Sequence, residues 1–198
     1  MALMSRRESI SFMDDYWRSN RPKSVTERVG AMVKLCRGRV LDVGCGKGQY
    51  AHLLGDWVGV DYSIEGLKSA KGDRVQADVE HLPFRDRCID TYFGSELLEH
   101  VVDDVKAVEE AKRVLRPDGI LIASTPNSIV RKEYWSQWVP SKSDKREYTP
   151  DSFVKTLGEN VKFHNYCRGD PTREVWLVAS LEMSENIACI PVPMRLPI

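Results

Sequence analysis

The chain has 198 residues, of which 42% are hydrophobic, and its 29 basic and 29 acidic side chains cancel to a net charge of zero. This length supports one domain with a substantial core, and the balanced charge gives no strong sign of a nucleic-acid-binding surface. The five cysteines are widely spaced and form no C-x-x-C pair, so they suggest neither a zinc site nor a disulfide framework.

The N-terminal residues lack the apolar core of a signal peptide, and no apolar run approaches the ~20 residues that span a bilayer. We therefore expect a cytoplasmic protein with reduced thiols and no transmembrane segment. Residues 1–38 are polar with a helical pattern and are expected to form an N-terminal cap segment. The main domain is expected at 39–182, with a lid insertion at 127–149, and a proline-containing tail at 183–198.

Strand-like and helix-like segments alternate between residues 39 and 126. The clearest helical pattern covers Asp103–Leu115, whose apolar residues follow helical spacing, and Arg116–Gly119 is expected to end it with a turn. This alternation predicts an α/β fold in which helices cover a parallel sheet. The strands expected before the insertion are Arg39–Val43, Trp57–Asp61, Arg74–Ala77, Ile89–Gly94 and Gly119–Ser124.

The insertion breaks the alternation, and a segment of this length without periodicity is typical of a functional lid. Its aromatic and basic side chains are Tyr134, Trp135, Trp138, Tyr148, Arg131, Lys132, Lys142, Lys145 and Arg146. After it, Thr149 is expected to cap a helix that has Pro150 at its first position. Two further strands, close enough to pair, are expected at Val161–Tyr166 and Val175–Leu181.

A glycine-rich turn follows the first expected strand, with glycines at positions 44, 46 and 48. Glycine has no Cβ, so the chain can turn sharply there and its backbone can approach a ligand closely. The P-loop pattern is absent, and Gln49 replaces the third glycine of the dinucleotide pattern, which disfavours a nicotinamide-dependent oxidoreductase. Asp61 ends the next strand, where a carboxylate can accept hydrogen bonds from both ribose hydroxyls. Together these features predict a site for a nucleoside cofactor.

Five motifs in order resemble the class I S-adenosylmethionine-dependent methyltransferases, in particular the small-molecule branch that includes ubiquinone- and menaquinone-pathway enzymes. They are Leu41–Gly48, Gly59–Ser63, Ala77–Phe84, Glu96–Val101 and Arg113–Gly119. The resemblance implies a Rossmann-like sheet of seven mostly parallel strands, with helices on both faces and an antiparallel last strand. It also implies S-adenosylmethionine as cofactor and S-adenosylhomocysteine as its product.

The resemblance assigns the methionine half of the cofactor to the first strand and its turn. Asp42 is implied to organise the ammonium, and the backbone carbonyl of Ser95 is implied to lie close to the same group. Backbone of the turn is implied to contact the methionine half at Gly44, Cys45, Gly46 and Gly48. For Asp42 and Asp61 alike, ordinary helix capping is the alternative role.

The nucleoside half is assigned to the next two strand ends. The resemblance implies that Asp61 holds the ribose hydroxyls and that Tyr62 flanks the adenine. Asp78 is implied to accept a hydrogen bond from the adenine amino group, while the backbone N–H of Val79 donates to the ring. A structural role is the alternative for Asp78.

His100 is the candidate general base, because an acceptor hydroxyl or amine must lose a proton during methyl transfer. Its alternative role is to shape the start of a helix. Glu96, Glu99 and His100 would share one face if this segment were helical, and the arrangement resembles the E-x-x-E-H motif of ubiquinone O-methyltransferases, where a divalent metal is implied. A hydrogen-bonded surface is favoured over metal binding for these three residues, so no metal site is expected.

We expect a methyltransferase that acts on O, N or C of a small-molecule acceptor, as a monomer or homodimer. Tyr134, Trp135 and Trp138 of the lid, with Tyr16 and Trp17 of the cap, can stack on an acceptor or pack the lid on the domain. Asp144 stands where many relatives carry a histidine. A tRNA-modifying methyltransferase and a non-catalytic cofactor-binding scaffold subunit remain the alternatives.

Overall fold

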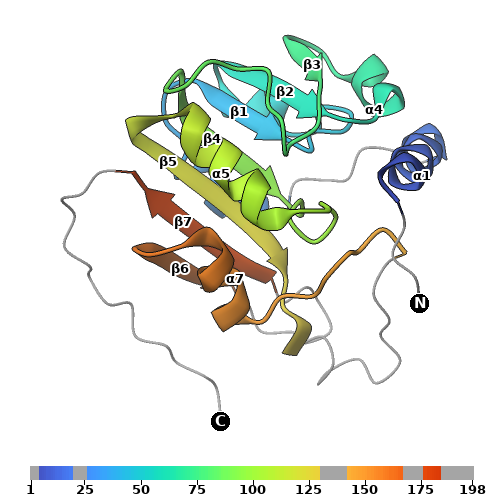
Figure 1. The fold of residues 1–198 in the computed structure, drawn as a ribbon. Coiled ribbons are helices and arrows are strands. Elements are labelled where there is room, and N and C mark those ends of the chain that lie inside the picture. Colours follow the sequence, from blue (N-terminus) through green and yellow to red (C-terminus); the bar gives the residue numbers. More distant parts are fainter. Residues whose placement is uncertain (1–4, 20–25, 130–141, 167–175, 184–198) are drawn as a thin grey trace.

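One twisted sheet forms the centre of the computed structural model, and helices cover both of its faces (Figure 1). The structure describes residues 5–19, 26–129, 142–166 and 176–183. Its elements are α1 (Arg6–Ser19), α2 (Glu27–Val33), β1 (Val40–Val43), α3 (Ala51–Leu54), β2 (Trp57–Asp61), α4 (Ile64–Ser69), β3 (Arg74–Gln76), β4 (Ile89–Ser95), α5 (Asp104–Val114), β5 (Leu115–Pro126), α7 (Pro150–Leu157), β6 (Val161–Tyr166) and β7 (Trp176–Glu182).

The seven strands follow the order β3-β2-β1-β4-β5-β7-β6. Pairs from β3 to β5 are parallel, whereas β7 runs antiparallel to both β5 and β6. This confirms the predicted α/β fold with an antiparallel last strand. The order reverses between β1 and β4, and open α/β sheets bind ligands beyond the carboxyl ends of the strands at such a switch point.

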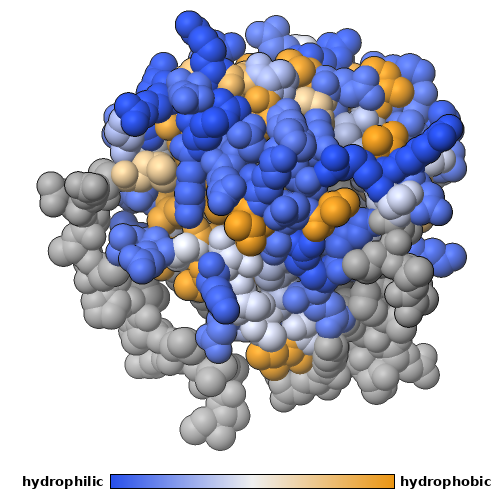
Figure 2. Space-filling model, viewed as in Figure 1, coloured by the Kyte–Doolittle hydropathy of each residue, from blue (hydrophilic) through white to orange (hydrophobic). Residues whose placement is uncertain are grey.

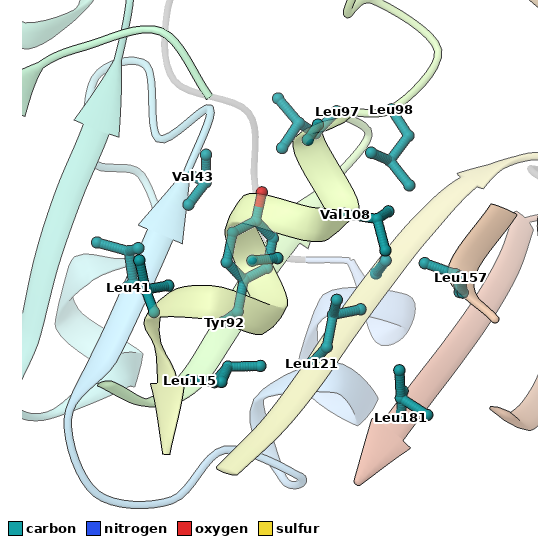
Figure 3. Close-up of a cluster of buried hydrophobic side chains, with 14 of the residues drawn as sticks. Leu41, Val43, Tyr92, Leu97, Leu98, Val108, Leu115, Leu121, Leu157 and Leu181 are labelled. Carbon is teal, nitrogen blue, oxygen red and sulfur yellow. The ribbon is translucent and has the colours of Figure 1, made fainter. Parts of the chain in front are cut away.

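Apolar side chains fill both faces of the central strands. On one face, Leu41 of β1 and Leu121 of β5 pack with Val108 of α5 and Leu157 of α7 (Figure 3). On the other face, α2 contributes side chains such as Met32 to a second cluster. Strands β1, β2 and β4 are buried along almost their whole length, which explains their nearly continuous apolar sequence.

The predicted strand positions are confirmed to within a residue or two, except at β5. Its pairing begins at Leu115, which faces Ile89, while Ile120 faces Thr91. Two steps along β4 therefore match five along β5, so residues 116–119 loop out of the ladder as an irregularity inside the strand. The expected turn is thus part of β5 rather than a separate connection before it.

The helix boundaries follow the predicted caps. The side chain of Asp103 accepts a hydrogen bond from the backbone N–H of Lys106 and so caps α5. Thr149 caps α7 in a reciprocal pair of hydrogen bonds with Ser152, and Pro150 occupies the first turn. Helices α1 and α2 confirm the helical pattern of the N-terminal segment.

Hydrophilic side chains dominate the face shown in Figure 2, where the apolar side chains outside the grey residues form small separate spots. Within the described ranges, no helix has the length and apolar character needed to cross a membrane. Several expectations fall on residues outside the described ranges: lid residues Arg131, Lys132, Tyr134, Trp135 and Trp138, and the tail beyond residue 183. The division into cap, main domain and tail stays a prediction.

Candidate active site

A cavity of about 230 Å³ opens at the carboxyl ends of β1 and β2. Its walls come from these strand ends, the loop after β3, the turn after β4, and helix α1. Among the predicted site residues, those that line it are Gly44, Asp61, Tyr62, Asp78, Val79 and His100. Residues far apart in the sequence therefore meet around one space, at the place where the sheet topology predicts a ligand.

The glycine-rich turn adopts a backbone that favours glycine, with φ of +74° at Gly44 and +50° at Gly46. The N–H of Gly44 donates to the carbonyl of Val60 at 2.8 Å, which ties the turn to β2. A Cβ at Gly46 would overlap the indole ring of Trp17. The space beside Gly46 is thus used by the cap helix α1, whereas Gly44 reaches the cavity.

Asp61 is buried at the end of β2 and held by two backbone donors. Its Oδ2 accepts from the N–H of Gly46 and its Oδ1 from the N–H of Ser63, both at 2.8 Å. Burial raises the pKa of this carboxyl to about 6, although the backbone donors oppose the rise. Ser63, not Asp61, caps helix α4, so helix capping does not account for Asp61.

Asp42 lies inside β1 and is 2% exposed, so it caps no helix. Within the described part of the chain, its Oδ2 has no hydrogen-bond partner. Burial, with a contribution from the nearby Asp61, raises the pKa of the Asp42 carboxyl to about 8. An unsatisfied buried carboxyl costs stability, and a cationic group such as an ammonium would satisfy it. Its chemistry therefore fits the predicted cofactor.

Asp78, the predicted acceptor for the adenine amino group, is already engaged with helix α1. Its Oδ2 lies 3.1 Å from Nη1 of Arg6, and its Oδ1 accepts from the backbone N–H of Glu80 at 3.0 Å. Arg6 also pairs with Glu80. The Tyr62 hydroxyl donates to the carbonyl of Ser9 at 3.3 Å. Helix α1 thus closes the nucleoside end of the cavity through polar contacts.

Arg28 of α2 is a residue that the sequence did not single out. It is 4% exposed, and its guanidinium donates to the hydroxyls of Ser95, at 2.9 Å, and Ser124. It also pairs with Glu96, a non-glycine residue with a φ of +54°. A lone arginine in a short helix carries no sequence signal, yet here it braces the turn after β4 against the end of β5.

The metal arrangement considered as the less favoured alternative required residues 96–100 to be helical, and this condition is not met because the segment is a turn. Glu96 points to Arg28, while Oε2 of the buried Glu99 accepts from the Thr125 hydroxyl at 3.1 Å. Burial raises the pKa of the Glu99 carboxyl to about 7. Glu96 and Glu99 are thus engaged with different partners, and no group of His, Cys, Asp and Glu suited to a metal occurs among the residues that the structure describes.

His100 lines the cavity and is the only predicted catalytic side chain. Its Nδ1 lies 3.1 Å from Oδ1 of Asp144, the residue that replaces the histidine of many relatives. Desolvation lowers the pKa of the imidazole, but the Asp144 and Glu99 carboxyls outweigh it and raise this pKa to about 8. His100 therefore borders the cavity as an imidazole with an acid behind it.

Comparisons with known proteins agree with this geometry. Residues 41–123 match the family described as the methyltransferase domain. The chain is 33% identical over 126 residues to a probable S-adenosylmethionine-dependent methyltransferase of Mycolicibacterium smegmatis, covering 59% of this chain and 48% of that protein. It is 31% identical over 147 residues to a ubiquinone biosynthesis O-methyltransferase of Bradyrhizobium diazoefficiens, covering 62% and 57%.

The chain thus spans about half the length of these curated relatives. Among solved structures, it resembles a Thermotoga maritima methyltransferase described as a possible histamine N-methyltransferase, with a TM-score of 0.68 and 18% identity, over 88% of this chain and 97% of that one. This likeness concerns the fold. Residues 41–123 thus match a methyltransferase domain, and the chain is similar in sequence to S-adenosylmethionine-dependent methyltransferases.

Proposed function

We propose that the protein transfers a methyl group from S-adenosylmethionine to O, N or C of a small-molecule acceptor. The observation that carries this proposal is the pair of buried acids at the ends of β1 and β2. Asp61 is oriented by backbone donors, whereas Asp42 retains an unsatisfied oxygen. A ligand with a cation at one end and a sugar at the other can bind both carboxyls, the cation at Asp42 and the sugar hydroxyls at Asp61.

Different residues bind different parts of the cofactor. Asp42 receives the ammonium, and Arg28 fixes Ser95 beside it. Asp61 holds the ribose, Tyr62 flanks the adenine, and the backbone N–H of Val79 donates to the ring. The ion pair between Arg6 and Asp78 shields the nucleoside end from solvent and competes with the adenine amino group for the carboxylate.

Bound S-adenosylmethionine supplies a methyl group already activated on a sulfonium, so positioning of the acceptor provides much of the rate. The chain then has to exclude water and remove a proton. His100 does the second task when the acceptor is a hydroxyl or amine. Since the pKa of His100 is raised to about 8, the neutral ring becomes dominant only above that pH, and we expect the rate to rise through this region.

A small acceptor is favoured because the cavity is limited and α1 closes one side of it. The test has two stages. Calorimetry with S-adenosylhomocysteine measures cofactor binding, with Asp42→Asn as the variant expected to bind weakly. Radiolabelled S-adenosylmethionine is then incubated with the protein in a cell extract, and the label is traced in small-molecule, protein and RNA fractions.

Label in the small-molecule fraction is the expected result. A catechol, 3,4-dihydroxybenzoate, serves as a direct probe, since one relative is named for O-methylation in ubiquinone biosynthesis. Label in RNA would support a tRNA-modifying enzyme instead. Binding without transfer in any fraction would support a scaffold subunit, and tight binding of NADH without S-adenosylhomocysteine binding would overturn the proposal.

A further inference from the structure

We propose that Asp144 is the positioning residue for His100, so that the two side chains act as a base and its orienting carboxylate. Asp144 holds the proton on Nδ1, and Nε2 is left to take the proton of the acceptor. This inference rests on the proposed function, because it assigns a partner to the base of that same site. It also gives the segment after residue 141 a direct part in the chemistry.

The geometry of the pair supports this assignment. His100 is 26% exposed and lines the cavity, and its buried Nδ1 lies 3.1 Å from Oδ1 of Asp144. Among the described residues no partner meets hydrogen-bond geometry with this nitrogen, so the ring has to rotate slightly to direct its N–H at the carboxylate. Asp144 is itself only 10% exposed. The edge of the ring that carries Nδ1 is therefore turned toward the carboxylate in the protein interior, while the side chain as a whole still borders the cavity.

Two residues that follow Asp144 bond to backbone carbonyls on either side of His100, one through its backbone N–H and one through its guanidinium. The N–H of Lys145, the residue after Asp144, donates to the carbonyl of Glu99 at 2.6 Å. The next residue, Arg146, donates to the carbonyl of Val102 at 2.6 Å and pairs with Asp104. The segment that carries Asp144 thus runs along the segment that carries His100, joined by successive bonds. A side chain placed in this way is a fixed partner for the imidazole.

A second link ties this segment to the cap. Nζ of Lys145 donates to the Ser9 hydroxyl at 2.7 Å, and Ser9 also accepts from Tyr62 through its carbonyl. The same stretch therefore touches the base, the cap helix and, through Ser9, the residue that flanks the adenine. Closure of α1 over the cavity and alignment of the imidazole are structurally connected.

The charges around His100 also support its pairing with Asp144. Asp144 and Glu99 are the acids that face it, and both raise the pKa of the imidazole against the effect of burial. Across the cavity, Arg6 pairs with Asp78, so that cation is neutralised by its own partner. Removal of the Asp144 charge should consequently leave burial as the dominant influence and lower the pKa of His100.

Transfer to a hydroxyl acceptor moves one methyl group and one proton. The acceptor oxygen forms a bond to the methyl carbon while the carbon–sulfur bond breaks, and the electron pair of that bond stays on sulfur. The hydroxyl proton passes to Nε2 of His100. The positive charge of the sulfonium thereby becomes an imidazolium charge, which the carboxylate of Asp144 stabilises at Nδ1.

Nitrogen-15 NMR of the His100 ring tests the pair without requiring an identified acceptor. The chain has four histidines, so His100→Gln assigns the signal. In the unaltered protein we expect a neutral ring protonated on Nδ1 and a pKa above the ordinary ~6.5. Asp144→Asn should lower this pKa by one unit or more and mix the two tautomers. Asp151→Asn, a change of an exposed acid in the first turn of α7, should alter neither.

An unchanged pKa and tautomer in Asp144→Asn would overturn the proposal. If that variant fails to fold, the nitrogen-15 spectrum of the unaltered protein tests the proposal by itself. A neutral His100 ring protonated on Nε2 would contradict the assignment. Once labelled product is obtained, the pH profile of kcat should shift to lower pH in Asp144→Asn. The limiting kcat at high pH should be at least tenfold lower, while the affinity for S-adenosylhomocysteine should be unchanged. Failure of every variant and of the unaltered protein to bind S-adenosylhomocysteine would refute the proposed function instead.

Discussion

Asp42 should release a proton when the cofactor binds. In the free protein, burial and the neighbouring Asp61 raise the pKa of Asp42 to about 8, so the carboxyl is mostly protonated at pH 7. An ammonium placed beside it favours the ionised form and lowers this pKa. Binding of S-adenosylhomocysteine, which has the same amino acid end as the methyl donor, is therefore coupled to ionisation of a group in β1.

The number of protons released on binding follows from the pKa of Asp42. With a pKa of about 8, Asp42 carries about 0.9 proton at pH 7. The α-amino group of the ligand, with an ordinary pKa of ~7.7–8.0, takes up only about 0.1–0.2 proton at this pH. Asp61, with a pKa of about 6, carries only about 0.1 proton and adds little. A net release of about 0.7–0.8 proton is expected. Near pH 9 the sign should reverse, since Asp42 is then already ionised and the ligand amine must become protonated.

Calorimetry in two buffers of different ionisation enthalpy measures this number directly. Asp42→Asn keeps the shape of the side chain but cannot ionise, so it should abolish the release and weaken binding by about 1–3 kcal/mol, the usual cost of losing a charged hydrogen-bond partner. The reasoning is refuted if the unaltered protein releases no proton at pH 7. It is equally refuted if Asp42→Asn releases as much as the unaltered protein.

Three other predictions concern Asp61, the glycine-rich turn and the absence of a metal requirement. Asp61→Ala should weaken S-adenosylhomocysteine binding by about 1–3 kcal/mol, and an unchanged dissociation constant in calorimetry would remove Asp61 from the ribose role. Gly46→Ala should destabilise the fold by about 2–4 kcal/mol in urea unfolding, because it adds strain at positive φ to an overlap with Trp17; an unchanged midpoint would contradict the packing of α1 on the turn. EDTA should leave cofactor binding and methyl transfer intact, since Glu96 and Glu99 are engaged with Arg28 and Thr125; loss of activity restored by a divalent ion would reinstate a metal.

The sequence predicted the centre of the sheet well because β1, β2 and β4 are buried along almost their whole length. The segments that became β1, β2 and β4 are bounded by glycines and polar residues, so their limits could be located closely. The start of β5 was harder, since Arg116–Gly119 has the composition of a turn. In the structure this stretch does leave the ladder, but Leu115 before it still pairs with Ile89, and no local pattern reveals such a distant pairing.

The site residues divide in a similar way. Asp61 and the glycines were singled out from their positions at strand ends, whereas the role of Asp42, inside β1, was implied by the family resemblance. Arg28 and Asp144 could not be found in either way, because their importance arises from contacts with Ser95 and His100 that only the tertiary fold creates. The metal interpretation depended on helical geometry after β4, and a turn with a positive φ there directs the acids apart.

The contrast between the two buried acids explains why β1 keeps a carboxyl in its interior. Leu41 and Val43 on either side of Asp42 are fully apolar and bury well, so an apolar residue at this position would remove a cost of about 1–3 kcal/mol for an unsatisfied buried group. Asp61 avoids that cost because the backbone of Gly46 and Ser63 satisfies it. In the proposed complex a ligand cation would remove the cost at Asp42, and a ligand that binds only the folded state would stabilise it further by mass action. The free protein is therefore less stable than its strand pattern would allow, and the difference is recovered when the cofactor is bound.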